Sequence, residues 1–79
     1  MRAYVLAKIE AGKEDEAINA LLKIPEVKRL MEVLGPYDLI AEIEIRDEAH
    51  LNDVVIRNIR ALESIRDTLT LIVAREHES

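Results

Sequence analysis

Cysteine is absent from this 79-residue chain, which excludes disulfide bonds and thiol nucleophiles. Histidine occurs only at His50 and His77, and neither is spaced to place two metal ligands on one helix face or in a chelating turn. A chain this short buries only about 60 to 65% of the surface that its unfolded form exposes, so disulfides, a metal or self-association usually reinforce it. The sequence therefore predicts one domain over residues 1–79, reinforced by self-association.

Long apolar runs are also missing: none approaches the ~20 residues that a membrane-spanning helix needs. Met1 leads directly into a strand-like segment and not into a signal peptide, so we expect a cytoplasmic protein with no membrane partner. The 11 basic and 16 acidic residues give a net charge of -5, and the scattered basic residues argue against direct nucleic-acid binding. Glutamine is absent and 34% of residues are charged, a composition that leans towards a heat-loving source.

Hydrophobic periodicity divides the chain into six elements. Residues 2–10 alternate as a strand, residues 13–23 form an amphipathic helix that Pro25 ends, and residues 27–34 and 37–46 form a hairpin around Gly35-Pro36. Asp47 is the expected N-cap of a second helix, residues 68–74 form the last strand, and residues 75–79 form a frayed tail. The expected apolar stripes of the helices are Ala17, Ile18, Leu21 and Leu22, then Leu51, Val54, Val55, Ile59 and Leu62.

This order of elements predicts an α+β, ferredoxin-like βαββαβ fold, with a four-stranded antiparallel sheet in the order 4-1-3-2 and two helices on one face. The other face is then bare, and it should carry more apolar surface than a monomer normally exposes. A second copy is the simplest cover, which predicts a sheet-to-sheet homodimer and a ring of dimers. The residues expected on the bare face are Tyr4, Leu6, Met31, Ile40, Thr70 and Ile72, with the charged Lys8, Glu42 and Glu44 among them. The dimer interface is predicted to contain Tyr4, Leu6, Met31, Ile40, Glu42 and Ile72.

Side chains able to support catalysis are few. The hydroxyl nucleophiles are limited to Ser64, Thr68, Thr70 and Ser79, without an evident base and orienting group. Glu42 and Glu44 are interpreted as the rim of the interface, and His50 as part of a solvated helix face. We therefore predict a protein that is not an enzyme, with no catalytic residue, metal site or cofactor.

The turn at Gly35-Pro36-Tyr37-Asp38 offers another kind of chemistry. Pro36 fixes its own φ and Gly35 has no side chain, so the main-chain polar groups there can approach another molecule closely. Asp38 adds a charge beside them. The alternative is an ordinary hairpin in which Asp38 bonds its own backbone.

The stretches "LGPYDLIAEIEIRD" and "ESIRDTLTLIVAR", together with "PEV" at residues 25–27, resemble the ligand-binding (RAM) domain of the Lrp/AsnC regulators. The resemblance covers nearly the whole chain and suggests a stand-alone form without the helix-turn-helix region. It implies sheet-to-sheet dimers that join into octamers or similar rings, with amino-acid effectors held where dimers meet. By position, it implies an effector site formed by Gly35, Pro36, Tyr37, Asp38, Thr68 and Thr70. Glu63 and Ser64 depart from the Pro or Gly that the family often has before the last strand.

The function predicted from this resemblance is an amino-acid effector-binding, oligomer-forming regulatory domain that acts without its own DNA-binding region. An alternative is an interaction module that co-assembles with full-length Lrp/AsnC regulators and binds no effector. A dimeric α+β barrel enzyme shares the element order, but it needs an inward-facing polar cavity that is not evident in the sequence.

Overall fold

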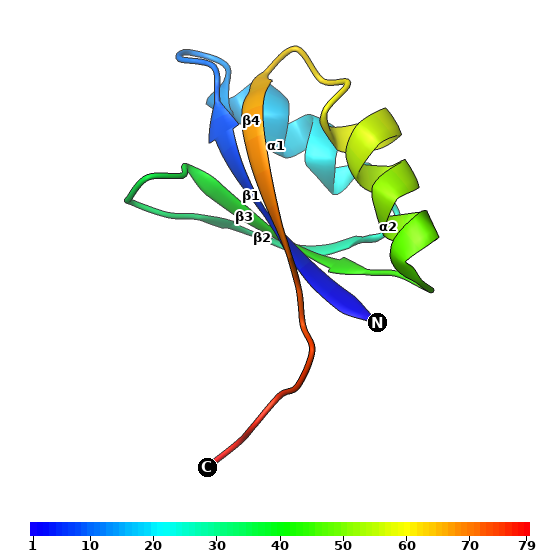
Figure 1. Ribbon diagram of the computed structural model, residues 1–79. Coiled ribbons are helices and arrows are strands. Elements are labelled where there is room, and N and C mark those ends of the chain that lie inside the picture. Colours follow the sequence, from blue (N-terminus) through cyan, green and yellow to red (C-terminus); the bar gives the residue numbers. More distant parts are fainter.

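The computed structural model describes all 79 residues and contains the six expected elements. In chain order they are β1 (Arg2–Ile9), α1 (Glu14–Leu22), β2 (Val27–Glu32), β3 (Leu39–Glu44), α2 (Glu48–Asp53) with its π-helical continuation η1 (Val54–Ile59), and β4 (Ile65–Ile72). The sheet order is β2-β3-β1-β4 with every neighbouring pair antiparallel, and the helices cover one face (Figure 1). Counted from β4, the order is 4-1-3-2, so the prediction of a ferredoxin-like fold is confirmed.

Strand β1 lies in the middle of the sheet, and its sequence alternation accounts for its two faces. Ala3, Val5, Ala7 and Ile9 are buried, whereas Arg2, Tyr4, Leu6 and Lys8 are half-buried. The four buried residues point towards the helices and form the centre of the core, together with Leu39, Ala41 and Ile43 of β3. The period of two in β1 and β3 therefore defines the core face of the sheet.

Helix α1 packs on the sheet through a narrower stripe than the sequence predicts. Ala17 and Leu21 are buried and Ile18 is half-buried, but Leu22 is 59% exposed. Ile24, which lies beyond the end of the helix, is buried in its place. The helix ends at Leu22, so the chain turns back to the core before Pro25.

The second helical segment begins as predicted at Asp47, whose Oδ1 accepts a hydrogen bond from the His50 main-chain N–H at 2.8 Å. Leu51, Val54, Val55 and Ile59 of the predicted stripe are buried, whereas Leu62 lies beyond the helix and is half-buried. The last six residues of the segment form a π-helix, and Arg60 N–H donates to the Val55 carbonyl at 2.7 Å. The wider turn lets Val54, Val55 and Ile59 all face the core.

Neither helical segment of the fold has the length and apolar character that a membrane-spanning helix needs.

Strand β4 corrects the predicted composition of the bare face, which we call the open face. In the register of β1 with β4, Tyr4 pairs with Leu71 and Leu6 with Leu69, whereas Val5 pairs with Thr70 and Ala3 with Ile72. Residues directly opposite in an antiparallel pair point to the same side. Thr70 and Ile72 therefore lie on the helix-covered side, and placing them on the open face was wrong.

The open face itself is as apolar as expected. Leu69 and Leu71 of β4 are 44% and 50% exposed on it. They adjoin the half-buried Tyr4 and Leu6 of β1. On the same side, Met31 of the outer strand β2 pairs with Ile40 of β3.

Residues 73–79 have no regular secondary structure, although Val73 N–H bonds to the Arg2 carbonyl and Arg2 forms an ion pair with Glu76.

Candidate functional site

The turn between β2 and β3 is longer than the Gly35-Pro36 pair and runs from Val33 to Asp38. It is closed by a hydrogen bond of 3.0 Å from Val33 N–H to the Asp38 carbonyl. Asp38 N–H donates to the Ala7 carbonyl at 2.9 Å, and Asp38 Oδ2 accepts from Ile9 N–H at 2.8 Å. Asp38 thus bonds the neighbouring strand β1 with both its main chain and its side chain, and it fixes the turn at the end of that strand.

The middle of the turn leaves main-chain donors free. The N–H groups of Leu34, Gly35 and Tyr37 make no hydrogen bond within the chain. Gly35 has φ of +154°, a conformation that favours glycine, and nothing lies within 4 Å of where a Cβ would stand. The turn therefore presents unpaired amides at an open position.

Tyr37 is held at the turn by a contact with the central strand. The Lys8 Nζ lies 5.4 Å from the centroid of the Tyr37 ring, within the range of a cation–π interaction. Lys8 belongs to the open-face set of β1, so the ring of Tyr37 connects the turn to that face.

A pocket of about 230 Å³ lies beside the turn. Its lining consists of Ile9, Glu14, Glu32, Val33, Leu34 and Asp38. Three of these side chains are aliphatic, three are carboxylates, and none is basic. The volume is below the ~300 Å³ at which drug-sized ligand sites begin, so the pocket matches a ligand the size of one amino acid.

The structure places the second predicted group of site residues elsewhere. Thr68 pairs with Ala7 of β1, and the other neighbour of Ala7 in the sheet is Leu39 of β3. Thr68 and the turn therefore flank β1 from opposite sides, about 10 Å apart by two strand spacings. Thr68 lines a separate pocket of about 100 Å³ with Arg60, Ile65, Arg66 and Asp67. Within one chain, Gly35 to Asp38 and the threonines Thr68 and Thr70 do not form one site.

Of the six residues that line the pocket, only Asp38 was predicted as a site residue; Gly35, Pro36 and Tyr37 do not line it, and the acidic Glu14 and Glu32 are among the lining residues that the sequence analysis missed. Glu32 ends β2, and Glu14 begins α1. The βαββαβ topology could have indicated them. In this topology the end of β1, the start of α1 and the β2–β3 turn all lie at the same end of the sheet, where these strands begin or finish. The sequence alone does not show which side chains at that end face a common space.

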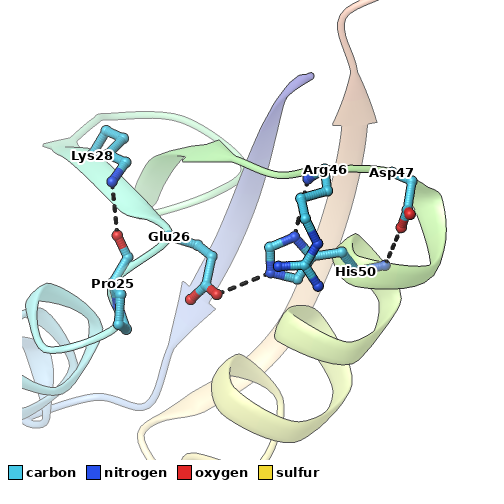
Figure 2. A network of polar contacts seen from close by, with 6 residues as sticks. All are labelled: Pro25, Glu26, Lys28, Arg46, Asp47 and His50. Carbon is cyan, nitrogen blue, oxygen red and sulfur yellow. Dashed lines mark hydrogen bonds and ion pairs between the residues drawn. The ribbon is translucent and has the colours of Figure 1, made fainter.

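A polar network fixes the opposite end of the molecule, where β2 and α2 begin (Figure 2). His50 Nδ1 accepts from Arg46 N–H at 3.0 Å, so the proton of the neutral ring is on Nε2, which lies 2.9 Å from Glu26 Oε2. The hydrogen bond from His50 lowers the pKa of Glu26 below its usual range, and a hydrogen bond from its own main chain acts in the same direction. The His50 side chain is only 11% exposed, so its interpretation as part of a solvated helix face was wrong.

Acidic and imidazole side chains do not assemble into a metal centre anywhere in the chain. No group of three or more His, Cys, Asp or Glu side chains is placed to hold a metal ion. Glu42, which was predicted at the interface rim, accepts a hydrogen bond of 3.1 Å from the Tyr4 hydroxyl on the open face.

The topology defines a small α+β domain of the ferredoxin-like class, with a pocket beside the β2–β3 turn. Residues 2–79 match the family model of the Lrp/AsnC ligand binding domain, and the chain belongs to that family. It is 32% identical to the HTH-type transcriptional regulator FL11 of Pyrococcus furiosus over 76 residues, which are 96% of this chain and 50% of that protein. The chain thus spans about half the length of the regulators it matches.

A different kind of relative shares the same segment. The homocitrate synthase of Sulfurisphaera tokodaii is 35% identical over 77 residues, covering 96% of this chain and 16% of the enzyme. A likeness to one-sixth of an enzyme identifies a shared domain and transfers no catalytic activity.

Solved structures agree with the fold. The protein TTHA0845 from Thermus thermophilus superimposes with a TM-score of 0.92 at 32% identity, covering 99% of this chain and 98% of that one. The transcriptional regulator NMB0573 from Neisseria meningitidis, solved as a complex with L-Met, gives a TM-score of 0.91 at 18% identity, covering 99% of this chain and 52% of that one. At that identity, the second likeness shows the fold alone.

Proposed function

We propose that this chain is an amino-acid effector-binding, oligomer-forming regulatory domain and has no catalytic activity of its own. The observation that carries the proposal is the amino-acid-sized pocket beside unpaired turn amides, in a chain of the Lrp/AsnC ligand-binding family. The L-Met complex of a regulator with the same fold supports an amino acid as the ligand class.

The turn supplies both kinds of group that an amino-acid zwitterion requires. The main-chain N–H of Leu34, which lines the pocket, and those of Gly35 and Tyr37, which belong to the same turn but do not line the pocket, are free to donate to an α-carboxylate. Asp38 uses Oδ2 for Ile9 and keeps Oδ1 to accept from an α-ammonium group. Because β1 and Pro36 already hold the turn, little conformational entropy remains to be lost when the effector binds.

The open face supports the oligomeric part of the proposal. Leu69 and Leu71 are about half exposed there and adjoin Tyr4 and Leu6. Covering a few hundred Å² of such surface is worth several kcal/mol at ~25 cal/mol per Å². A second copy can bury this face around a two-fold axis, and rings of such dimers would bring the turn of one subunit near another subunit.

Regulation then follows from linkage. An effector that binds the assembled form more tightly than the dissociated form shifts the equilibrium towards assembly. The largest factor by which it can change the equilibrium constant is the ratio of its affinities for the two forms. Thr68 and Thr70 are too far from the turn of their own chain to contact an effector bound there. They could contact an effector only at the turn of a neighbouring subunit.

Two measurements test this function. Isothermal calorimetry of the assembled protein against the twenty amino acids should show saturable heat for at least one of them. Sedimentation velocity with and without that amino acid should show a dimer or larger species whose distribution changes on binding. A protein that is assembled but gives no heat with any amino acid would overturn the effector-binding function, and a stable monomer at micromolar concentration would overturn the assembly.

A further inference from the structure

We infer that the pocket beside the β2–β3 turn selects amino acids with a cationic side chain, which names the effector class and rests on the proposed function. The lining contains Glu14, Glu32 and Asp38 and no basic residue, so its formal charge is -3 when all three are ionised. The other three lining residues are the aliphatic Ile9, Val33 and Leu34. A four-carbon stem that ends in a positive charge matches both halves of this lining.

The carboxylates of the pocket are not neutralised from within the chain. Lys13, Arg2, Arg57 and Arg66 form ion pairs with other acidic residues, and none of Glu14, Glu32 or Asp38 takes part in an ion pair. Glu14 Oε1 accepts only a long hydrogen bond of 3.3 Å from Gly12 N–H. A cation brought into the pocket is therefore attracted by carboxylates that have no other charged partner, whereas an anionic effector is repelled by them.

The geometry favours an organic cation over a metal ion. A divalent metal requires several oxygen ligands that converge on one point. The three carboxylates of the pocket do not converge in this way, because they form no group that could hold a metal ion. An extended molecule can instead bond one carboxylate with its α-ammonium group and another with its side-chain terminus.

The positions of the three carboxylates assign one to the α-ammonium group of the ligand and the other two to its side-chain terminus. Asp38 belongs to the turn, next to the free amides that suit the α-carboxylate, so it suits the α-ammonium group. Glu32 ends β2 and Glu14 begins α1, and both lie outside the turn itself. Ile9, Val33 and Leu34 provide the apolar surface for the stem, and Glu14 and Glu32 remain for the cationic end.

The test compares lysine with norleucine, which has the same four-carbon side chain and lacks the terminal ammonium group. Calorimetry of the assembled wild-type protein should give a dissociation constant for lysine at least about tenfold lower than for norleucine, the effect of one charge-assisted hydrogen bond. Glutamate should give no saturable heat. The lysine preference should fall as salt is raised from about 20 mM to about 500 mM, because screening weakens the charge pairing.

The double variant Glu14→Gln/Glu32→Gln preserves side-chain size and removes both charges, so the lysine preference should fall to about twofold or less. Glu16→Gln is the matched control, since Glu16 lies in the same helical turn as Glu14, is exposed and does not line the pocket. Circular dichroism and sedimentation check that each variant is folded and assembled.

The outcomes separate this inference from the proposed function. Norleucine or methionine binding as tightly as lysine to the wild type would overturn the cation preference and leave effector binding intact. A lysine preference that survives in the double variant would also overturn it, because the cation would then be held elsewhere. Absence of heat with every amino acid would overturn the proposed function itself.

Discussion

Asp38 Oδ2 accepts a hydrogen bond from the main-chain N–H of Ile9 at 2.8 Å, across 29 residues of sequence. The bond joins the β2–β3 turn to the last residue of β1, at the point where the main-chain ladder between β1 and β3 has ended. The alternative of an Asp that bonds only its own hairpin does not describe this arrangement. Asp38 therefore supports the fold and lines the pocket at the same time.

This double role predicts a coupled defect in Asp38→Ala. Loss of the acceptor for Ile9 should lower the free energy of unfolding by about 1 to 2 kcal/mol. Effector affinity should fall as well, because Asp38 is the proposed partner of the α-ammonium group. Urea denaturation and calorimetry measure the two effects. Asp38→Asn keeps an acceptor for Ile9, so its stability should stay closer to that of the wild type while its affinity falls, and equal stability losses in both variants would contradict this assignment.

Gly35 provides a test of the turn's backbone. Its φ of +154° lies in a region that side chains with a Cβ rarely adopt, yet no atom is near enough to clash with an added methyl group. Gly35→Ala should therefore destabilise the protein by backbone strain alone, by about 1 to 3 kcal/mol. It should also weaken effector binding, since the free amides are displaced.

The neighbouring proline is the matched control for that experiment. Pro36→Ala removes a constraint on the unfolded chain and introduces no strain, so its cost should be below about 1 kcal/mol. Thermal or urea unfolding of both variants decides the matter. A Gly35→Ala protein as stable as Pro36→Ala would show that the turn relaxes without cost.

The sequence was sufficient to predict the topology because its strongest local patterns each indicate a single kind of secondary structure. Ala3, Val5 and Ala7 alternate with neighbours of mixed polarity, and this period of two identifies the segment as a strand. The Asp47 cap is local chemistry between residues three positions apart. Such features depend on short stretches of chain, and the structure confirms them.

The features that sequence reasoning missed depend on register and on tertiary contacts. The β4 segment contains Leu69, Leu71 and Ile72, so both of its faces read as apolar, and only pairing with β1 fixes which side faces the helices. The partnership of His50 with Glu26 joins residues 24 positions apart on different elements. The assembly of Glu14 and Glu32 with Asp38 around one pocket also requires the folded chain.

The Glu26–His50 pair predicts a sensitivity to acid. The pKa of Glu26 is lowered in the folded protein, first by the hydrogen bond from His50, so its charged form stabilises the fold above the ordinary value of 4.5. As the pH falls from about 4.5 through the lowered pKa, the unfolded chain takes up the proton first and this stabilisation is lost. Urea unfolding between pH 6 and 3 should therefore show a smaller decline for Glu26→Gln than for the wild type.

Removing the histidine tests the same network at neutral pH. His50→Ala leaves Glu26 without its partner and Arg46 N–H without its acceptor, so the free energy of unfolding should fall by about 1 to 3 kcal/mol. His77→Ala is the control, because His77 is exposed among residues without regular structure. A loss of the same size in both variants would mean that the network adds nothing to stability.

Two adjacent residues of β4 separate the open face from the helix-covered side in an assembly experiment. Leu71 pairs with Tyr4 on the open face, and Ile72 pairs with Ala3 on the other side, while their exposures are similar at 50% and 43%. A buried, unpaired carboxylate strongly opposes association, so Leu71→Glu should convert the proposed dimer to monomer at micromolar concentration. Ile72→Glu should leave the dimer in place. Sedimentation velocity distinguishes these results, and dissociation by Ile72→Glu without dissociation by Leu71→Glu would show that the copies meet through another surface.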